Sequence, residues 1–156
     1  VTQLEGADVV ISAVAPRGAM EGLVRPNLEA LNTVLPESVR LGVIGGAGGS
    51  LVAPEDPRVV DVDFPDAFKA EALEMIGVLE DLQGEQTGRD WFFVHPAGGF
   101  GGFNPGERTG TYRVGGDVIV TDAEGQSYIS GADLAVAVLD EIENPQHSRR
   151  RFTVGY

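Results

Sequence analysis

Short apolar runs alternate along this chain with segments whose hydrophobic residues recur at helical spacing. The runs at residues 8–14, 41–44 and 91–94 are rich in β-branched and aromatic residues and do not alternate apolar with polar positions. Continuous apolar strands of this kind are typical of parallel sheets that are covered on both faces. The sequence therefore predicts an α/β fold, with a parallel sheet and helices on both of its faces.

The segments of helical spacing predict three helices, at 19–35, at 66–82 and from 131 to about 143. The second is the clearest, because acidic residues occupy its polar side and Gly84 follows its end. Ser130 suits the N-cap of the third helix.

Two further features of strand type lie in the C-terminal half of the chain. Residues 111–114 and 118–121 flank a Gly-Gly-Asp turn and predict a small β-hairpin. Residues 151–154 predict a final strand, and a short strand is also expected at 59–62.

Composition excludes several classes of function. The 156 residues suffice for a single domain, and 24 acidic against 11 basic residues give a net charge of -13, which would repel a phosphate backbone and argues against nucleic-acid binding. No apolar run approaches the roughly 20 residues that span a bilayer, so we expect no membrane partner. The absence of cysteine excludes disulfides, thiolate metal sites and a cysteine nucleophile, and suits a cytoplasmic protein.

A glycine-rich stretch, Gly45–Gly49, follows the apolar run 41–44. A dinucleotide-binding fingerprint would need a third glycine where Leu51 stands and a helix directly afterwards, but Pro54 and Pro57 interrupt any such helix. A flexible turn is one alternative. The interpretation we favour is the end of a later strand, where glycine lets a ligand approach the backbone closely.

Several stretches resemble one known family. They are Gly6–Val14, Val43–Gly48, Phe68–Leu73, Pro105–Arg113, Ile129–Ala135 and Arg151–Tyr156. The chain resembles the atypical short-chain dehydrogenase/reductases, most closely their NADH-flavin reductase-like branch. The resemblance implies a Rossmann-like NAD(P)-binding domain over 1–156, but only the C-terminal portion of that fold. Two βα units that carry the family's glycine-rich first turn would precede it, so we expect an incomplete domain whose first strand lies near an open edge, and a homodimer is one expected consequence.

The resemblance also implies a site at the strand ends. Matching positions for cofactor binding are Ser12, Ala13, Val14, Ile44, Gly45, Gly46, Lys69, His95, Pro96 and Ala97. His95 and Lys69 are the expected catalytic residues, His95 beside the nicotinamide ring and Lys69 at the ribose hydroxyls. Pro65 stands where the family's acid-base tyrosine would lie. We expect no metal, because the two histidines are far apart in sequence.

Each candidate has a structural alternative. Lys69 could be a surface cation, and His95 a hydrogen-bonded core histidine. Phe100 and Phe103 could line a pocket for a flat ligand such as a flavin, or cap the core. His147 is expected at the surface, within a basic run that we interpret as a solvated strand edge.

The expected function is NADPH- or NADH-dependent reduction of a small-molecule substrate such as a flavin, a quinone or another electrophile. Such an enzyme is expected if the N-terminal half is present in the native protein. The alternative is a non-catalytic NAD(P)H-sensing or protein-interaction module, which the missing tyrosine favours. A third interpretation is a fragment of a complete family member.

Overall fold

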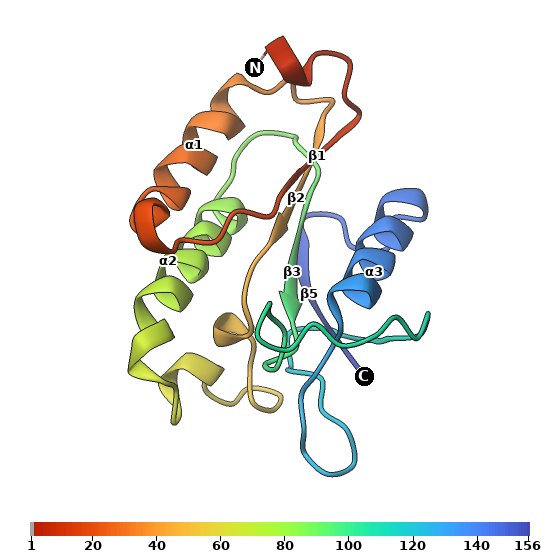
Figure 1. Ribbon diagram of the computed structural model, residues 1–156. Coiled ribbons are helices and arrows are strands. Elements are labelled where there is room, and N and C mark those ends of the chain that lie inside the picture. The colour runs from red at the N-terminus through yellow and green to blue at the C-terminus, as the bar shows by residue number, and fades with distance from the viewer. Residues whose placement is uncertain (1) are drawn as a thin grey trace.

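The computed structural model describes residues 2–156 and contains a five-stranded sheet in the order β1-β2-β3-β5-β4 (Figure 1). The strands are β1 (Val9–Ser12), β2 (Arg40–Ile44), β3 (Trp91–Pro96), β4 (Arg113–Gly115) and β5 (Arg150–Gly155). Strands β1, β2, β3 and β5 are parallel, and β4 is antiparallel to β5. The predicted α/β fold with a mainly parallel, Rossmann-like sheet is confirmed.

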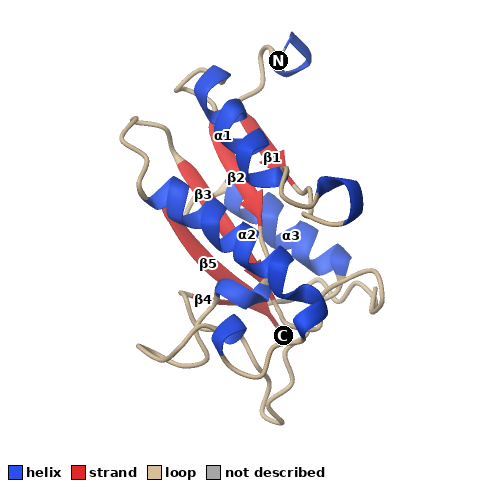
Figure 2. Ribbon diagram, turned by 90° about the vertical axis from the view of Figure 1, so that its left-hand side faces the viewer, coloured by secondary structure: helices blue, strands red, loops and turns tan. Residues whose placement is uncertain are grey.

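Helices cover both faces of this sheet, as predicted. Helices α1 (Val24–Val34) and α2 (Asp66–Gln83) lie on one face, and α3 (Gly131–Glu143) lies on the other (Figures 1 and 2). Four short 3-10 helices are Thr2–Leu4, Gly18–Met20, Ala47–Gly49 and Val59–Asp61. The last of these occupies the place where a short strand was expected.

Strand β3 shows why the strands are apolar throughout. Trp91 and Phe93 pack with α1 and α2, while Phe92 and Val94 belong to the core under α3. Successive side chains of a strand point to opposite faces, so a strand covered on both sides has no solvent-facing positions.

The predicted hairpin is wrong. Within residues 2–156, β4 takes its ladder partner from β5, with Val114 opposite Val154. The segment after the turn makes an isolated bridge instead, between Val118 and Leu51. The Gly-Gly-Asp turn does reverse the chain, but the edge of β5 offers β4 a longer, buried partner.

Helix α1 is capped by side chains from elsewhere in the chain. At its N-terminus, the carboxylate of Glu74 on α2 accepts hydrogen bonds from the backbone N–H groups of Gly22 (2.7 Å) and Arg25 (3.0 Å). At its C-terminus, the buried guanidinium of Arg89 donates to the carbonyls of Leu35 (2.6 Å), Asn32, Pro36 and Val39. Both partners carry the charge that a helix terminus favours.

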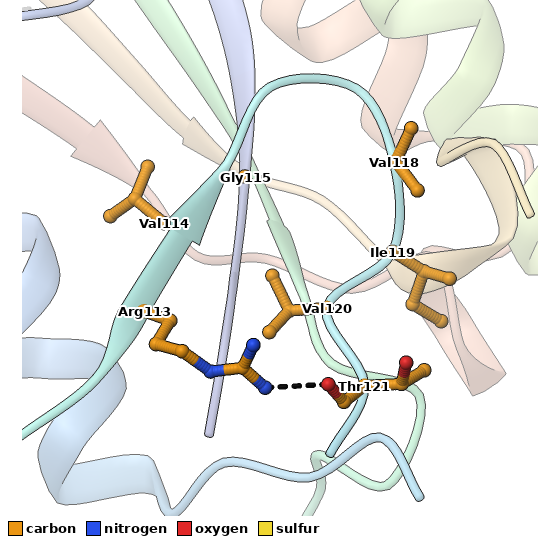
Figure 3. Close-up of a pocket in the computed structure, with 7 residues that line it drawn as sticks. All are labelled: Arg113, Val114, Gly115, Val118, Ile119, Val120 and Thr121. Atoms are coloured by element: carbon orange, nitrogen blue, oxygen red, sulfur yellow. Dashed lines mark hydrogen bonds between the residues drawn. The ribbon is translucent and has the colours of Figure 1, made fainter. Parts of the chain in front are cut away.

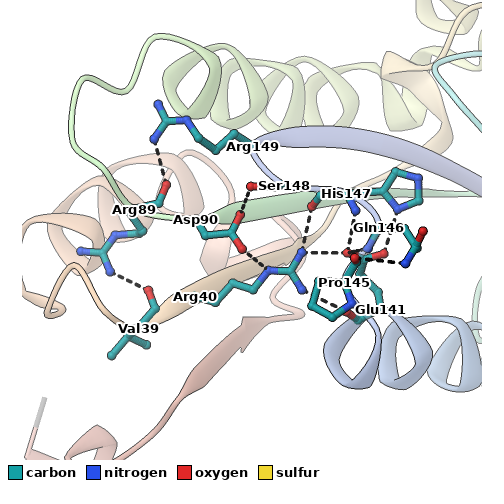
Figure 4. Close-up of polar contacts among 10 residues, drawn as sticks. All are labelled: Val39, Arg40, Arg89, Asp90, Glu141, Pro145, Gln146, His147, Ser148 and Arg149. Carbon is teal, nitrogen blue, oxygen red and sulfur yellow. Dashed lines mark hydrogen bonds and ion pairs between the residues drawn. The ribbon is translucent and has the colours of Figure 1, made fainter.

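A buried charged cluster ties α3 to the amino-terminal ends of the strands (Figure 4). Arg40 donates to Glu141 Oε1 (2.7 Å), and its Nε lies 2.8 Å from Asp90 Oδ2 without the alignment of a hydrogen bond. Burial by itself would raise the pKa of Glu141, but hydrogen bonds from Arg40 and His147 hold that pKa below its usual value.

The basic C-terminal run is exposed at Arg149 and Arg150, in line with the interpretation as a solvated edge, and half-buried at Arg151. His147 is half-buried, stacks on Phe152 with ring centroids 4.1 Å apart and contacts Glu141 (2.8 Å). Arg149, at φ 54°, donates to three carbonyls of the connection before β3.

None of the helices in residues 2–156 is long and apolar enough to cross a bilayer.

Candidate functional site

The predicted site residues at the strand ends lie next to one another along the carboxyl edge of the sheet. Ser12 pairs with Val43, Ile44 pairs with Val94, and Gly45 N–H donates to the Val94 carbonyl (2.8 Å). The ends of β1, β2 and β3 therefore form one row. Ligands of open α/β sheets bind at this edge.

Exposure differs along that row. Ala13 and Val14 are exposed, Ser12 and the residues 44–46 are half-buried, and the residues 95–97 are buried. A ligand can therefore reach the first two strand ends directly. The end of β3 is buried, and its His95 contacts the Gly46 carbonyl.

The glycines of the stretch 45–49 have different roles. A methyl group added at Gly45 would lie 2.2 Å from the Phe93 ring, and one at Gly48 would lie 2.7 Å from the Ala72 methyl. Both glycines therefore allow close packing. Gly46, by contrast, has nothing within 4 Å of such a methyl and an extended backbone (φ -126°, ψ 169°). Gly46 is the open position of this turn.

His95 lies beneath the glycine turn with 1% of its surface exposed. Its Nδ1 is 2.8 Å from the Gly46 carbonyl, so Nδ1 carries the proton and donates it. Nε2 is buried and has no hydrogen-bond partner among the described residues. Burial lowers the pKa of His95 to about 4, which the hydrogen bond to Gly46 only partly opposes.

Arg151 of β5 supports the same turn from its other end. Its Nη1 donates to the Gly49 carbonyl (2.8 Å), and its Nη2 lies 3.5 Å from the Asp117 carboxylate. The Ser50 hydroxyl donates to the Ala47 carbonyl (2.5 Å). The backbone of 46–50 is thus fixed by side chains from below and by its own serine.

Lys69 is exposed in the first turn of α2. Ala72, which packs under Gly48, lies one helical turn further along on the same side of the helix. The structure therefore places Lys69 on the helix that supports the glycine turn. Its amino group lowers the pKa of Asp61, though less than the Arg58 hydrogen bond does.

The loop that follows β3 is fastened at both ends. Near its start, Gly99 N–H donates to the Ser127 carbonyl (2.8 Å). Near its end, the buried carboxylate of Asp133 on α3 accepts hydrogen bonds from Thr109 N (2.9 Å), Thr109 Oγ1 (2.8 Å), Gly110 N (2.8 Å) and the Tyr156 hydroxyl. Desolvation opposes ionisation of Asp133, but these donors hold its pKa well below the usual value.

Sequence reasoning missed Asp133 as a site-shaping residue. The three stretches that resemble the family, around residues 109, 130 and 156, meet at this carboxylate. The visible signal is the acid three residues after the N-cap Ser130, but this pattern alone predicts no more than a capped helix. The two phenylalanines of the loop after β3 lie in different environments. Phe100 packs against the α3 core, whereas Phe103 is 75% exposed.

Two cavities lie outside the row of predicted site residues. One of about 530 Å³ lies beside β4, between Arg113–Gly115 and the residues 118–121, where Arg113 donates to the Thr121 carbonyl (Figure 3). The other, of about 490 Å³, lies between α1 and α2. None of the predicted site residues lines either of these two cavities.

Comparison with known proteins finds relatives over nearly the whole chain. It is 39% identical over 152 residues to YwnB, an uncharacterized protein of Bacillus subtilis, a match that covers 94% of this chain and 70% of YwnB. A solved structure from Streptococcus pneumoniae, provisionally named an NADH-flavin reductase, is 32% identical with a TM-score of 0.86, covering 99% of this chain and 74% of that one. A Burkholderia pseudomallei protein provisionally described as exported is 36% identical with a TM-score of 0.84 and the same coverage. No family model matches the chain.

Proposed function

The chain belongs to the family of YwnB and the pneumococcal NADH-flavin reductase-like protein, and from that premise we propose that it is an NAD(P)H-dependent reductase. It binds NADH or NADPH at the carboxyl edge of its sheet and reduces a flavin, a quinone or another small electrophile. Location in the cytoplasm, a homodimeric state and two βα units before residue 1 remain predictions.

The observation that carries this proposal is the open face of Gly46 in a row of accessible strand ends. Backbone without a side chain lets a flat or phosphorylated ligand approach closely. Gly46 has that space on one side while His95 holds its carbonyl from the other. The residues present thus fit a dinucleotide along the ends of β1 and β2.

We assign roles along this row as the resemblance to the short-chain dehydrogenase/reductases implies them. Ser12, Ala13 and Val14 contact the adenosine half, Ile44, Gly45 and Gly46 contact the nicotinamide half, and Lys69 reaches toward the ribose. A bound nicotinamide would supply hydride, a reaction that needs mainly positioning and the exclusion of water. Phe103, exposed on the neighbouring loop, offers a ring face for a flat acceptor.

The second candidate is a nucleotide-binding protein without catalysis. Pro65 favours this candidate, because it stands at the position of the family's tyrosine and has no proton to exchange. The burial of His95 favours it too, because a buried ring does not reach a ligand to exchange a proton with it. In this case the protein binds NADPH but oxidises it with no acceptor.

A matched pair of glycine variants tests the site. Gly46→Val fits the folded backbone and fills the space that a ligand would need, whereas Gly88→Val is equally unobstructed but lies in the connection before β3, at the opposite end of the strands. We expect NADPH and NADH binding, measured by calorimetry, to weaken at least about tenfold in Gly46→Val only. Oxidation with flavin or quinone then separates the enzyme from the sensor. Binding that is equal in both variants would refute this location.

A further inference from the structure

The turn 46–49 at the candidate site is held by two side chains that lie beneath it. His95 donates from Nδ1 to the Gly46 carbonyl, and Arg151 donates from Nη1 to the Gly49 carbonyl, both at 2.8 Å. These bonds bracket the turn at its first and last residue. A carbonyl bound from below fixes the plane of its peptide, because the peptide unit is rigid.

The pocket around the His95 ring leaves it little freedom. The Phe93 ring lies 4.9 Å away between centroids, and a methyl added at Gly49 would lie 3.0 Å from His95 Cε1. The charged groups that act on the ring are the Arg151 guanidinium and the Asp117 carboxylate. His95 is therefore locked as a neutral donor to one acceptor.

We propose that His95, together with Arg151, is a positioning residue that shapes the glycine turn for its ligand, and that it acts through the Gly46 carbonyl without touching the reacting atoms. This inference rests on the proposed function for its ligand. It replaces proton transfer by His95 with a purely geometric role. The buried ring reaches the ligand only through the backbone that it holds.

The chemistry of the side chain makes a sharp test available. Asparagine places an amide donor where the histidine Nδ1 lies, so His95→Asn keeps a bond to Gly46, whereas His95→Leu removes it. Arg151→Met releases the turn from its other end and leaves His95 intact, which guards against a variant that fails to fold. Lys69→Met alters the same site without touching the bonds beneath the turn and serves as the control.

Amide hydrogen exchange of Gly45 and Ser50, whose N–H groups donate to the Val94 and Ala47 carbonyls, reads the two ends of the turn and needs no ligand. We expect at least about tenfold faster exchange in His95→Leu and Arg151→Met, with β3 and β5 still protected, and near wild-type exchange in His95→Asn and Lys69→Met. We also expect calorimetric titration to show weakened NADPH binding in His95→Leu and Arg151→Met. NADPH binding by His95→Asn should be close to that of the wild type.

The outcomes separate this inference from the proposed function. Unchanged exchange and unchanged NADPH affinity in His95→Leu would overturn the positioning role. So would an asparagine variant that keeps the turn and KM but loses kcat, because that result would make His95 a proton donor or acceptor. If the wild-type protein binds neither nucleotide, the proposed function fails, and the exchange measurement alone still decides whether His95 holds the turn.

Discussion

The burial of His95 makes a quantitative prediction about acid stability. In the folded protein its pKa is lowered from 6.5 to about 4, because desolvation disfavours the charged ring and Arg151 repels it. The unfolded chain therefore takes up a proton below about pH 6.5 that the folded protein does not. Stability is fully present above this pH, falls as the pH is lowered toward 4, and levels off below that.

The size of the loss follows from the two pKa values. Each tenfold difference in proton affinity corresponds to about 1.4 kcal/mol, so the full contribution is about 3 kcal/mol. At pH 5 the unfolded histidine is almost wholly protonated and the folded one is almost wholly neutral. We therefore expect about 2 kcal/mol less stability at pH 5 than at pH 8 from this one group.

Urea unfolding at pH 8 and pH 5 measures this loss, with the fluorescence of Trp91 as reporter. Trp91 is the single tryptophan, is 2% exposed and lies on the same strand as His95. The matched variant is His95→Asn, which keeps a donor and cannot titrate. Carboxylates with lowered pKa, such as Asp133 and Glu141, lose their contribution mainly below about pH 4.5 and so affect both proteins alike.

For each protein we compare the unfolding free energy at pH 8 with that at pH 5. A cavity left by asparagine lowers both values equally, so it does not affect this difference. Wild type should lose about 2 kcal/mol more than His95→Asn between pH 8 and pH 5. Equal losses in the two proteins would refute the reasoning, because His95 would then be as easily protonated in the folded state as in the unfolded chain.

Three further substitutions test other contacts. Glu74→Gln should lower the unfolding free energy by about 0.5–1 kcal/mol, because a charged cap of α1 becomes neutral. Glu29→Gln, on the exposed face of α1, is the control and should change the unfolding free energy little. The midpoints of urea unfolding of the two variants measure the difference. Asp133→Asn should speed tryptic cleavage after exposed Arg108 about tenfold, because the loop loses its anionic anchor; an unchanged cleavage rate contradicts that role. Phe103→Ala should raise KM for a flavin several-fold and leave NADPH affinity and the urea midpoint unaltered, and an unaltered KM would remove Phe103 from the acceptor site.

The main elements could be predicted from the sequence because local periodicity determines them. The helix 66–82 appears as Asp66–Gln83, and the apolar run 91–94 appears within Trp91–Pro96. The hairpin could not be predicted correctly, because strand pairing depends on which edge is free. The partner of Val114 is Val154, which lies 40 residues further along the chain, so no local pattern indicates the pairing.

The candidate site was predictable as a location and not as a set of roles. Parallel strand ends must meet at one edge, so the residues around Ser12, Gly45 and His95 were brought together as expected. Which glycine is open depends on the Phe93 and Ala72 side chains beneath the turn. These contacts join residues that are distant in sequence, and no local pattern encodes them.

The capping of α1 has a consequence for the order in which the chain acquires structure. Its N-terminal cap, Glu74, lies 49 residues beyond Arg25, and its C-terminal cap, Arg89, lies 54 residues beyond Leu35. An isolated 11-residue helix is marginal in water. During synthesis α1 therefore emerges from the ribosome before the two side chains that hold its ends, and it has both caps only once Arg89 has followed. Weakening either cap should then mainly speed the unfolding of the finished protein and hardly slow its folding.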